Sequence, residues 1–168
     1  MKNIELKIAV GNFNKIILAL RKAKAKHFGR LRQIDIYYRC KSGRLKLRSV
    51  NDKNYELIFY RRSNRKNSKI SDYHIFAISP KQANDLEAFL NKSFGRQVMV
   101  KKKRDLWIYK NTRIHLDNVY RLGKFLELET VVKGNNLKKA KEEFIKVIKL
   151  LNLSAHEKES KSYSDLLK

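Results

Sequence analysis

Residues 113–117 and 125–129 alternate strictly between polar and apolar side chains. Successive side chains of a β-strand point to opposite faces, so this alternation predicts two strands, each with an apolar face and an ionic face. Gly123 lies between the two runs, where a turn would fold the second strand back beside the first. The resulting hairpin would bring Arg113 and Asp117 close to the carboxylates of the second strand.

Those carboxylates are Glu127 and Glu129, which are two positions apart and therefore project from the same side of the strand. Their spacing along the strand is roughly 6 to 7 Å. Such an oxygen pair can share one hard cation, for which Mg²⁺ and Mn²⁺ are the natural choices. A pair that faces solvent on an antiparallel sheet would look the same, so these two residues alone leave both interpretations open.

Composition bounds the class of protein and its partners. A length of 168 residues is enough for one domain with its own core, and we expect residues 1–168 to form a single domain. Forty Lys and Arg against sixteen Asp and Glu give a net charge of +24, which predicts a polyanionic partner, although an AT-rich genome would also raise the Lys content. With Cys40 as the only cysteine and no apolar leader in residues 1–10, we expect a cytoplasmic protein that is not bound to a membrane.

Other segments repeat the strand pattern of the hairpin or show helical periodicity. A helix is expected from Asn14, a second from Ser79-Pro80 with Ala83, Leu86, Phe89 and Leu90 as its buried stripe, and a third after Gly134. The polar tail ends in Tyr163, Leu166 and Leu167, which should dock on the domain. The expected strands cover residues 1–10, 33–39, 44–49, 55–62, 71–78, 97–104, 106–109, 112–119 and 125–132, which makes about eight once neighbouring segments are joined.

Residues 44–49 carry the sharpest basic pattern, because Arg44, Lys46 and Arg48 share one strand face. Like charges at this spacing repel one another unless an anion lies over them. A solvated strand and a bound anion are both compatible with the pattern.

Helices can cover the apolar faces of the strands on the outside of the sheet. The ionic faces of the strands must then face one another. A sheet that closes on itself would enclose the ionic faces as a polar, hydrated tunnel. We therefore predict an α+β fold, a closed eight-stranded antiparallel β-barrel with helices packed on the outside. His115 is the one histidine predicted to face inward, and we interpret it as a hydrogen-bonding group behind the site, not as a ligand or base.

Six segments, taken in order along the chain, resemble the CYTH family, also called triphosphate tunnel metalloenzymes. That family includes class IV adenylyl cyclases, thiamine triphosphatases and inorganic triphosphatases. The segments are NIELK (3–7), GRLKLR (43–48), VKKKR (100–104), DNV (117–119), LGKFLELE (122–129) and SYSDLL (162–167).

The resemblance implies a tunnel in which basic side chains bind a triphosphate and carboxylates hold Mg²⁺ or Mn²⁺. Glu5, Lys7 and Asp117 would be the catalytic residues, with Asp117 orienting a basic side chain or water. Metal ligands would be Glu5, Glu127 and Glu129. The phosphate-binding residues would be Lys7, Arg44, Lys46, Arg48, Lys102, Arg104 and Arg113, together with Arg61 or Arg62.

One position departs from the family motif Glu-x-Glu-x-Lys, whose first residue is here Asn3. An amide oxygen can coordinate a metal, but it brings no charge and cannot act as a base. The leading prediction is metal-dependent hydrolysis of an inorganic or nucleoside triphosphate. The alternatives are a class IV adenylyl cyclase and a non-catalytic protein that binds polyphosphate, nucleotides or RNA ends. We expect a small anionic triphosphate as the partner, with nucleic acid less favoured, and a monomer or homodimer.

Overall fold

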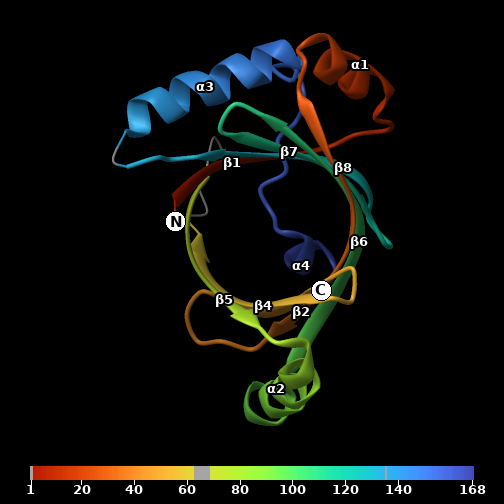
Figure 1. Cartoon of the computed structure of the whole chain (residues 1–168), viewed down its shortest axis with the longest axis vertical. Coiled ribbons are helices and arrows are strands. Elements are labelled where there is room, and N and C mark those ends of the chain that lie inside the picture. The colour runs from red at the N-terminus through yellow and green to blue at the C-terminus, as the bar shows by residue number, and fades with distance from the viewer. Residues whose placement is uncertain (1, 63–68, 135) are drawn as a thin grey trace.

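The computed structural model describes residues 2–62, 69–134 and 136–168. Within these residues, eight antiparallel strands close into a barrel in the order β1-β5-β4-β3-β2-β6-β7-β8, seen nearly end-on in Figure 1. The predicted α+β barrel is therefore confirmed. The strands are β1 (Lys2–Ala9), β2 (Lys26–Tyr38), β3 (Arg44–Val50), β4 (Asn54–Arg62), β5 (Lys69–Ile78), β6 (Arg96–Tyr109), β7 (Thr112–Val119) and β8 (Gly123–Val131).

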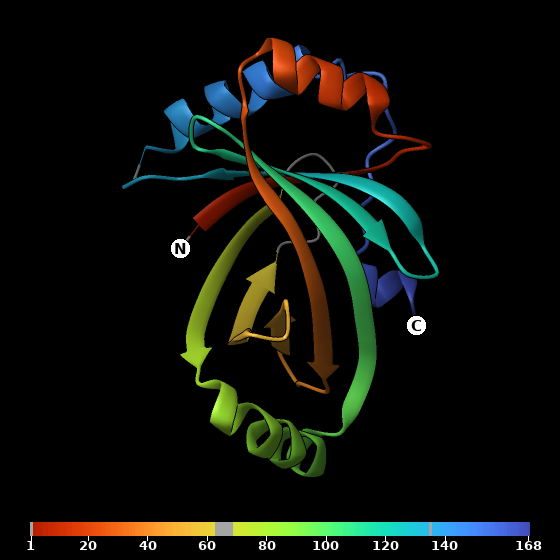
Figure 2. The same cartoon turned by 45° about the vertical axis from the view of Figure 1, so that its right-hand side comes forward.

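The described helices are α1 (Asn14–Lys22), α2 (Pro80–Phe94), α3 (Leu137–Leu150) and the short α4 (Tyr163–Leu166). Figures 1 and 2 show α1 and α3 on one side of the barrel, over β1, β7 and β8, and α2 on the opposite side. None of the helices in the described ranges is long and apolar enough to cross a membrane.

The largest core lies between the barrel wall and the helices α1 and α3. Ile4, Leu6 and Ile8 of β1 pack there with Leu20 of α1 and Val147 of α3. These strand residues are the apolar members of the alternating pattern, so their polar neighbours in the sequence must point into the barrel. Burial of the outer faces thus fixes which side chains line the tunnel.

A smaller core lies between α2 and the side of the barrel that includes β2 and β3. One of the four residues predicted to form the buried face of this helix is exposed. Ala83 and Leu90 are buried, and Leu86 packs against the same cluster. Phe89, however, is 62% exposed. Leu86 and Leu90 pack against the sheet residues of this cluster, whereas Phe89 faces solvent.

Two strands are longer than the sequence predicted. β2 begins at Lys26 and not at Gln33, and β6 runs unbroken from Arg96 to Tyr109. Both extensions come from their mutual pairing, which follows β2 from Lys26 to Tyr38 with a register shift beside Gly29. Cross-strand pairing thus holds residues 26–32 extended although they lack regular alternation.

The C-terminal tail docks as predicted. Ser162 and Asp165 form a capping box at the start of α4, in which each residue's side chain accepts a hydrogen bond from the other's backbone N–H. Tyr163 is buried, and Leu166 and Leu167 pack against the apolar cluster near it. This places α4 at one end of the barrel interior, where Figure 1 shows it within the ring of strands.

Candidate active site inside the barrel

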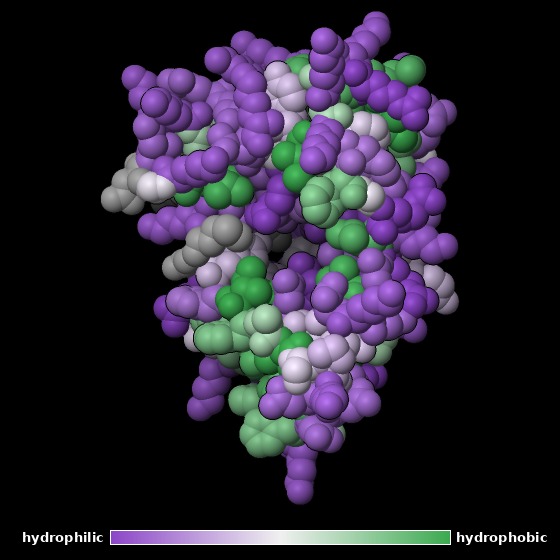
Figure 3. Space-filling view, viewed as in Figure 1, coloured by the Kyte–Doolittle hydropathy of each residue, from purple (hydrophilic) through white to green (hydrophobic). Residues whose placement is uncertain are grey.

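The barrel encloses a cavity of about 120 Å³, which has room for several water-sized groups. Figure 3 shows hydrophilic side chains over most of the viewed face and a hollow near its centre. The lining includes nine of the predicted site residues: Glu5, Lys7, Lys46, Arg48, Lys102, Arg104, Arg113, Glu127 and Glu129. The structure therefore brings these residues together, while their roles stay predictions.

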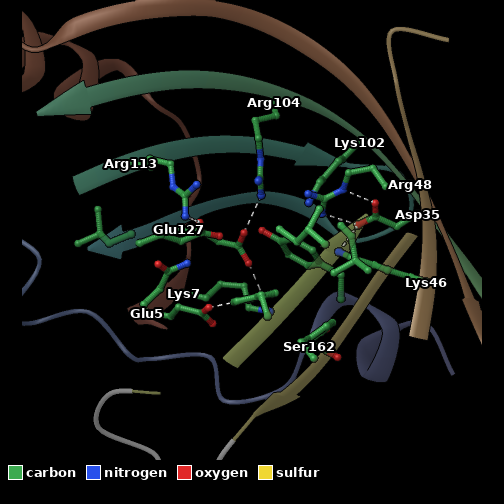
Figure 4. Close-up of a pocket in the computed structure, with 18 of the residues that line it drawn as sticks. Glu5, Lys7, Asp35, Lys46, Arg48, Lys102, Arg104, Arg113, Glu127 and Ser162 are labelled. Carbon is green, nitrogen blue, oxygen red and sulfur yellow. Dashed lines mark hydrogen bonds and ion pairs between the residues drawn. The ribbon is translucent and has the colours of Figure 1, made fainter. Parts of the chain in front are cut away.

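The two glutamates of β8 are each paired with an arginine from a nearby strand, and Figure 4 shows the pair of Arg104 and Glu127. Arg104 Nη2 lies 2.6 Å from Glu127 Oε2, and Arg113 Nη2 lies 3.0 Å from Glu129 Oε2. Burial alone would raise the pKa of Glu127, but Arg104, Lys102 and Lys7 together outweigh burial and lower that pKa. Glu127 is therefore ionised at neutral pH and already oriented.

Asp117 organises two cations of β6 and is fully buried behind the lining. Arg104 donates to both of its carboxylate oxygens, at 2.6 and 2.5 Å, and Lys102 Nζ is 3.7 Å from Oδ2. Since the carboxylate accepts a bidentate arginine, it fixes the direction of that side chain. Burial opposes its charge, but Arg104 and Lys102 more than compensate and lower the pKa of Asp117.

Asp35 of β2 holds two cations of β3 in the same way. It was not among the site residues predicted from the sequence. Arg48 donates to both of its oxygens, at 2.7 and 3.0 Å, and Lys46 Nζ donates at 2.9 Å. Burial would raise the pKa of Asp35, but Arg48 and then Lys46 hold it well below its ordinary value. The alternation of Ile34, Asp35 and Ile36 could have indicated that Asp35 lies on the polar face of β2. The register then places it directly across from Arg48.

The two cations held by Asp35 respond differently to burial. Burial, followed by the charge of Arg48, lowers the pKa of Lys46 to about 7. The pKa of Arg48 is raised, because Asp35 outweighs the cost of burying its guanidinium. Lys46 is thus a cation whose charge depends on pH near neutrality, whereas Arg48 remains charged.

Glu5 and Lys7 extend from β1 into the same cavity. Glu5 Oε1 accepts a 2.6 Å hydrogen bond from the Tyr73 hydroxyl. Lys7 Nζ donates to the carbonyl of Lys161, lies 3.9 Å from Glu127 Oε1, and sits 4.2 Å from the centre of the Tyr163 ring. Both predicted residues are therefore at the junction of β1, β8 and the C-terminal tail.

His115 lies beside the two β8 glutamates, and its imidazole completes a group that fits a divalent metal ion. One ligand atom from each of His115, Glu127 and Glu129 lies within 4.8 Å of the other two. Burial, then the nearby Arg104, lowers the pKa of His115 to about 4, so the imidazole is neutral at pH 7. Neutral imidazole and ionised carboxylates are the forms that bind metals.

Asn3 occupies the first position of the family motif and is nearly fully buried. In the amide orientation that satisfies both of its polar atoms, its oxygen accepts from Arg113 Nη2 at 2.9 Å and its nitrogen donates to the carbonyl of Lys2 at 3.0 Å. The amide oxygen is thus directed at an arginine. Arg113 in turn bridges Asn3 and Glu129.

Two predicted phosphate-binding residues, Arg44 and Arg61, are not among the described residues that line the main cavity. Arg44 lies in a neighbouring pocket, where Nη2 donates to Asp165 Oδ2 at 2.7 Å, so it fastens α4. Arg61 is exposed. The side chain of Arg62 falls outside the part of the chain that the structure describes.

The sequence reading also missed an aromatic section of the lining. The rings of Tyr60 and Tyr73 stack with centroids 5.0 Å apart, and Ile58 and Ile75 lie beside them along the cavity. Aromatic and β-branched residues are ordinary strand formers, so the sequence alone gave no signal that these face inward.

Comparisons with known proteins agree with this geometry. A family model for the CYTH domain matches residues 1–163. A protein of Methanocaldococcus jannaschii named "putative adenylate cyclase" is 28% identical over 174 residues, covering 99% of this chain and 98% of the relative.

Solved structures share the barrel over its whole length. A protein from Pyrococcus horikoshii matches with a TM-score of 0.84 at 26% identity, covering 99% of each chain. A Hippeastrum protein described as a "putative adenylyl cyclase" with a dominant triphosphatase activity matches with a TM-score of 0.72, covering 98% of this chain and 94% of its own. At 13% identity, the Hippeastrum protein shows a common fold only.

Proposed function

The chain belongs to the CYTH family, and we propose that it is a divalent-metal-dependent hydrolase of inorganic or nucleoside triphosphates. The observation that supports this most strongly is the buried set of Lys and Arg side chains around the cavity inside the barrel. Two aspartates, Asp35 and Asp117, each hold two of these cations in place. Cations fixed before the substrate arrives need little reorganisation to stabilise charge on phosphoryl oxygens.

The charge balance of the described lining also fits a triphosphate bound with a divalent ion. Six basic residues line the cavity (Lys7, Lys46, Arg48, Lys102, Arg104 and Arg113), against four acidic ones (Glu5, Asp35, Glu127 and Glu129) and Asp117 directly behind them, which leaves one positive charge in excess when Lys46 is protonated. One divalent ion would raise this excess to three. A triphosphate carries about four negative charges, so the loaded site would balance most of that charge.

We assign the cofactor to the carboxylate side of the cavity, where Glu127 and Glu129 lie opposite Lys7 and Glu5 in the β1 and β8 register. When bound there, Mg²⁺ or Mn²⁺ would polarise a phosphoryl oxygen and lower the pKa of a coordinated water. Glu5 would orient the attacking water beside this position. Asp117 has both oxygens occupied by Arg104, so its role is positioning and not proton transfer.

The phosphate chain would lie along the cations of β3 and β6. Lys46 and Arg48 come from one wall and Lys102 and Arg104 from the neighbouring wall across β2. Lys7 projects from β1 near Glu127, at the boundary between the cationic and the acidic sections of the lining. It would contact the phosphoryl group closest to the metal and balance the charge that develops there.

A class IV adenylyl cyclase is the second candidate, and two observations favour it. The Methanocaldococcus relative is named "putative adenylate cyclase". The stacked Tyr60 and Tyr73 also give the lining an aromatic section on which a base could lie. Hydrolysis needs only water and in-line geometry and no base site, so it remains the leading proposal.

The test is a product assay with tripolyphosphate and ATP in the presence of Mg²⁺ or Mn²⁺. Wild-type protein is compared with Glu127→Gln, which keeps the shape of the side chain but removes its charge, and with Lys141→Ala on the exposed face of α3 as the control. Phosphate release that is lost in Glu127→Gln and kept in Lys141→Ala supports the hydrolase. Formation of cyclic AMP and pyrophosphate would favour the cyclase over the hydrolase. If neither metal gives any product, the non-catalytic binding protein remains as the alternative.

A further inference from the structure

The imidazole of His115 faces the two β8 glutamates across a pair of hydrogen-bonded strands. His115 is the register partner of Glu127, and Arg113 is the partner of Glu129. The Nδ1 atom of His115 lies 3.7 Å from Glu129 Oε1. This is too long for a hydrogen bond. It does match two ligands of one ion, because bonds of about 2.1 Å place ligands about 3 Å apart at a right angle and about 4.2 Å apart on opposite sides.

The burial of His115 gives a second and independent indication. The residue is 4% exposed, and Nδ1 has no hydrogen-bond partner among the described residues. A buried polar nitrogen without a partner costs free energy, so native proteins rarely leave one unsatisfied. The hydrogen bond that the sequence suggested for this histidine is thus not made by Nδ1 in the described part of the chain. A metal ion would satisfy the nitrogen.

The arginines around the group orient the carboxylates without using all their oxygens. Arg104 pairs with Glu127 through Oε2, and Arg113 pairs with Glu129 through Oε2. The Oε1 atom of Glu129 is the one that faces His115. Outer partners of this kind fix the direction of a ligand oxygen and tune its affinity for metal.

Asn3 on β1 does not direct its amide oxygen at the two glutamates. That oxygen accepts a hydrogen bond from Arg113 instead. His115 lies on the other side of β8, next to the same two glutamates.

We propose that His115 is a direct metal ligand, together with Glu127 and Glu129, and that this site binds Mn²⁺ in preference to Mg²⁺. Mg²⁺ favours an all-oxygen shell and gives up water reluctantly, whereas imidazole nitrogen is a good ligand for first-row transition metals. The inference deepens the proposed function by assigning the metal to the β7 and β8 wall. It concerns metal binding alone and is tested without substrate.

The direct test is pulsed electron paramagnetic resonance of Mn²⁺ bound to the tag-free full-length protein, which detects a coordinated ¹⁴N nucleus. We expect an imidazole nitrogen coupling in the wild-type protein. It should vanish in His115→Ala and persist in His156→Ala, an exposed histidine between α3 and α4 that serves as the matched control. The variants assign the coupling to one of the four histidines, whereas a wild-type spectrum without nitrogen coupling refutes the proposal whether or not the variant folds.

Calorimetric titrations with Mn²⁺ and with Mg²⁺ supply the second readout. His115→Ala should weaken Mn²⁺ binding by about tenfold or more and change Mg²⁺ binding much less. A wild-type spectrum without nitrogen coupling, or the absence of saturable Mn²⁺ binding, overturns the proposal. If hydrolysis depends on Glu127 while the spectrum shows no nitrogen, the proposed function stands and only the role of His115 fails.

Discussion

The hydroxyl of Tyr163 donates a 2.9 Å hydrogen bond to Asp117 Oδ2 and so joins the C-terminal helix α4 to the barrel wall at β7. The same ring lies 4.2 Å from Lys7 Nζ and 5.0 Å from Lys102 Nζ. Lys102 is therefore held from two sides, by Asp117 behind it and by the face of Tyr163. In this way the last few residues of the chain form part of the tunnel.

Tyr163→Phe removes this hydrogen bond but keeps the ring over the two lysines. Since hydrogen bonds to charged groups contribute more than neutral ones, we expect the free energy of unfolding to fall by about 1.5 to 3 kcal/mol. Urea denaturation measures the change. Tyr120→Phe is the control, because that ring is 70% exposed and its substitution should have an effect of less than about 0.5 kcal/mol. Equal effects of the two substitutions would mean that the bond to Asp117 does not stabilise the fold.

Asp35→Asn leaves Lys46 and Arg48 buried without their anion. Removing one partner of a buried ion pair costs about 3 to 5 kcal/mol, and we expect a loss of unfolding free energy in that range. Tripolyphosphate should restore more stability to this variant than to the wild-type protein, because its oxygens can replace the missing carboxylate. Thermal unfolding with and without tripolyphosphate measures both effects.

The matched control for this change is Asp52→Asn, whose carboxylate pairs with Arg32 on the surface. An exposed pair contributes about 0 to 1 kcal/mol, so its loss should be small and insensitive to tripolyphosphate. If Asp35→Asn behaves like Asp52→Asn, then Asp35 does not organise the cations of β3.

The lowered pKa of Lys46 predicts how binding depends on pH. The protonated amine attracts phosphate, and its population falls as the pH rises through about 7. The dissociation constant of tripolyphosphate should therefore rise above pH 7, by up to about tenfold per pH unit for one linked proton. Titration calorimetry at several pH values from 6 to 9 measures this dissociation constant.

The variant Lys46→Arg distinguishes the titration of the protein from the titration of the ligand in that experiment. Its guanidinium stays charged throughout the range, whereas the ionisation of tripolyphosphate is common to both proteins. We expect the difference between the two curves to widen above pH 7. Parallel curves would show that Lys46 keeps its proton in the free protein.

Much of the site followed from the two-residue period of strands. Once the apolar residues of β1, β7 and β8 are assigned to the outside, Glu5, Lys7, Arg113 and Glu129 must face inward, and the structure places them there. The closed barrel followed from the same reasoning, because the ionic faces had to meet.

Other features depend on packing that a single sequence does not contain. The partners of Asp35 are set by the register between β2 and β3, and the stack of Tyr60 on Tyr73 by the register between β4 and β5. Phe89 fits the helical spacing of α2, yet it is exposed, whereas Leu86 and Leu90 pack against the sheet. Arg44 continues the basic pattern of β3 but lies near the barrel end, where Asp165 of α4 binds it.

The central claim is that the buried cations inside the barrel, and not the basic outer surface, bind a triphosphate. The most direct measurement is calorimetry of tripolyphosphate binding to the wild-type protein, to Lys102→Gln, and to a triple variant with Lys138, Lys139 and Lys141 changed to Gln. We predict one site per chain, affinity reduced by about tenfold or more in Lys102→Gln, and no change in the triple variant on exposed α3. Affinity that survives in Lys102→Gln but falls in the triple variant would contradict the account and place the anion on the outside of the barrel.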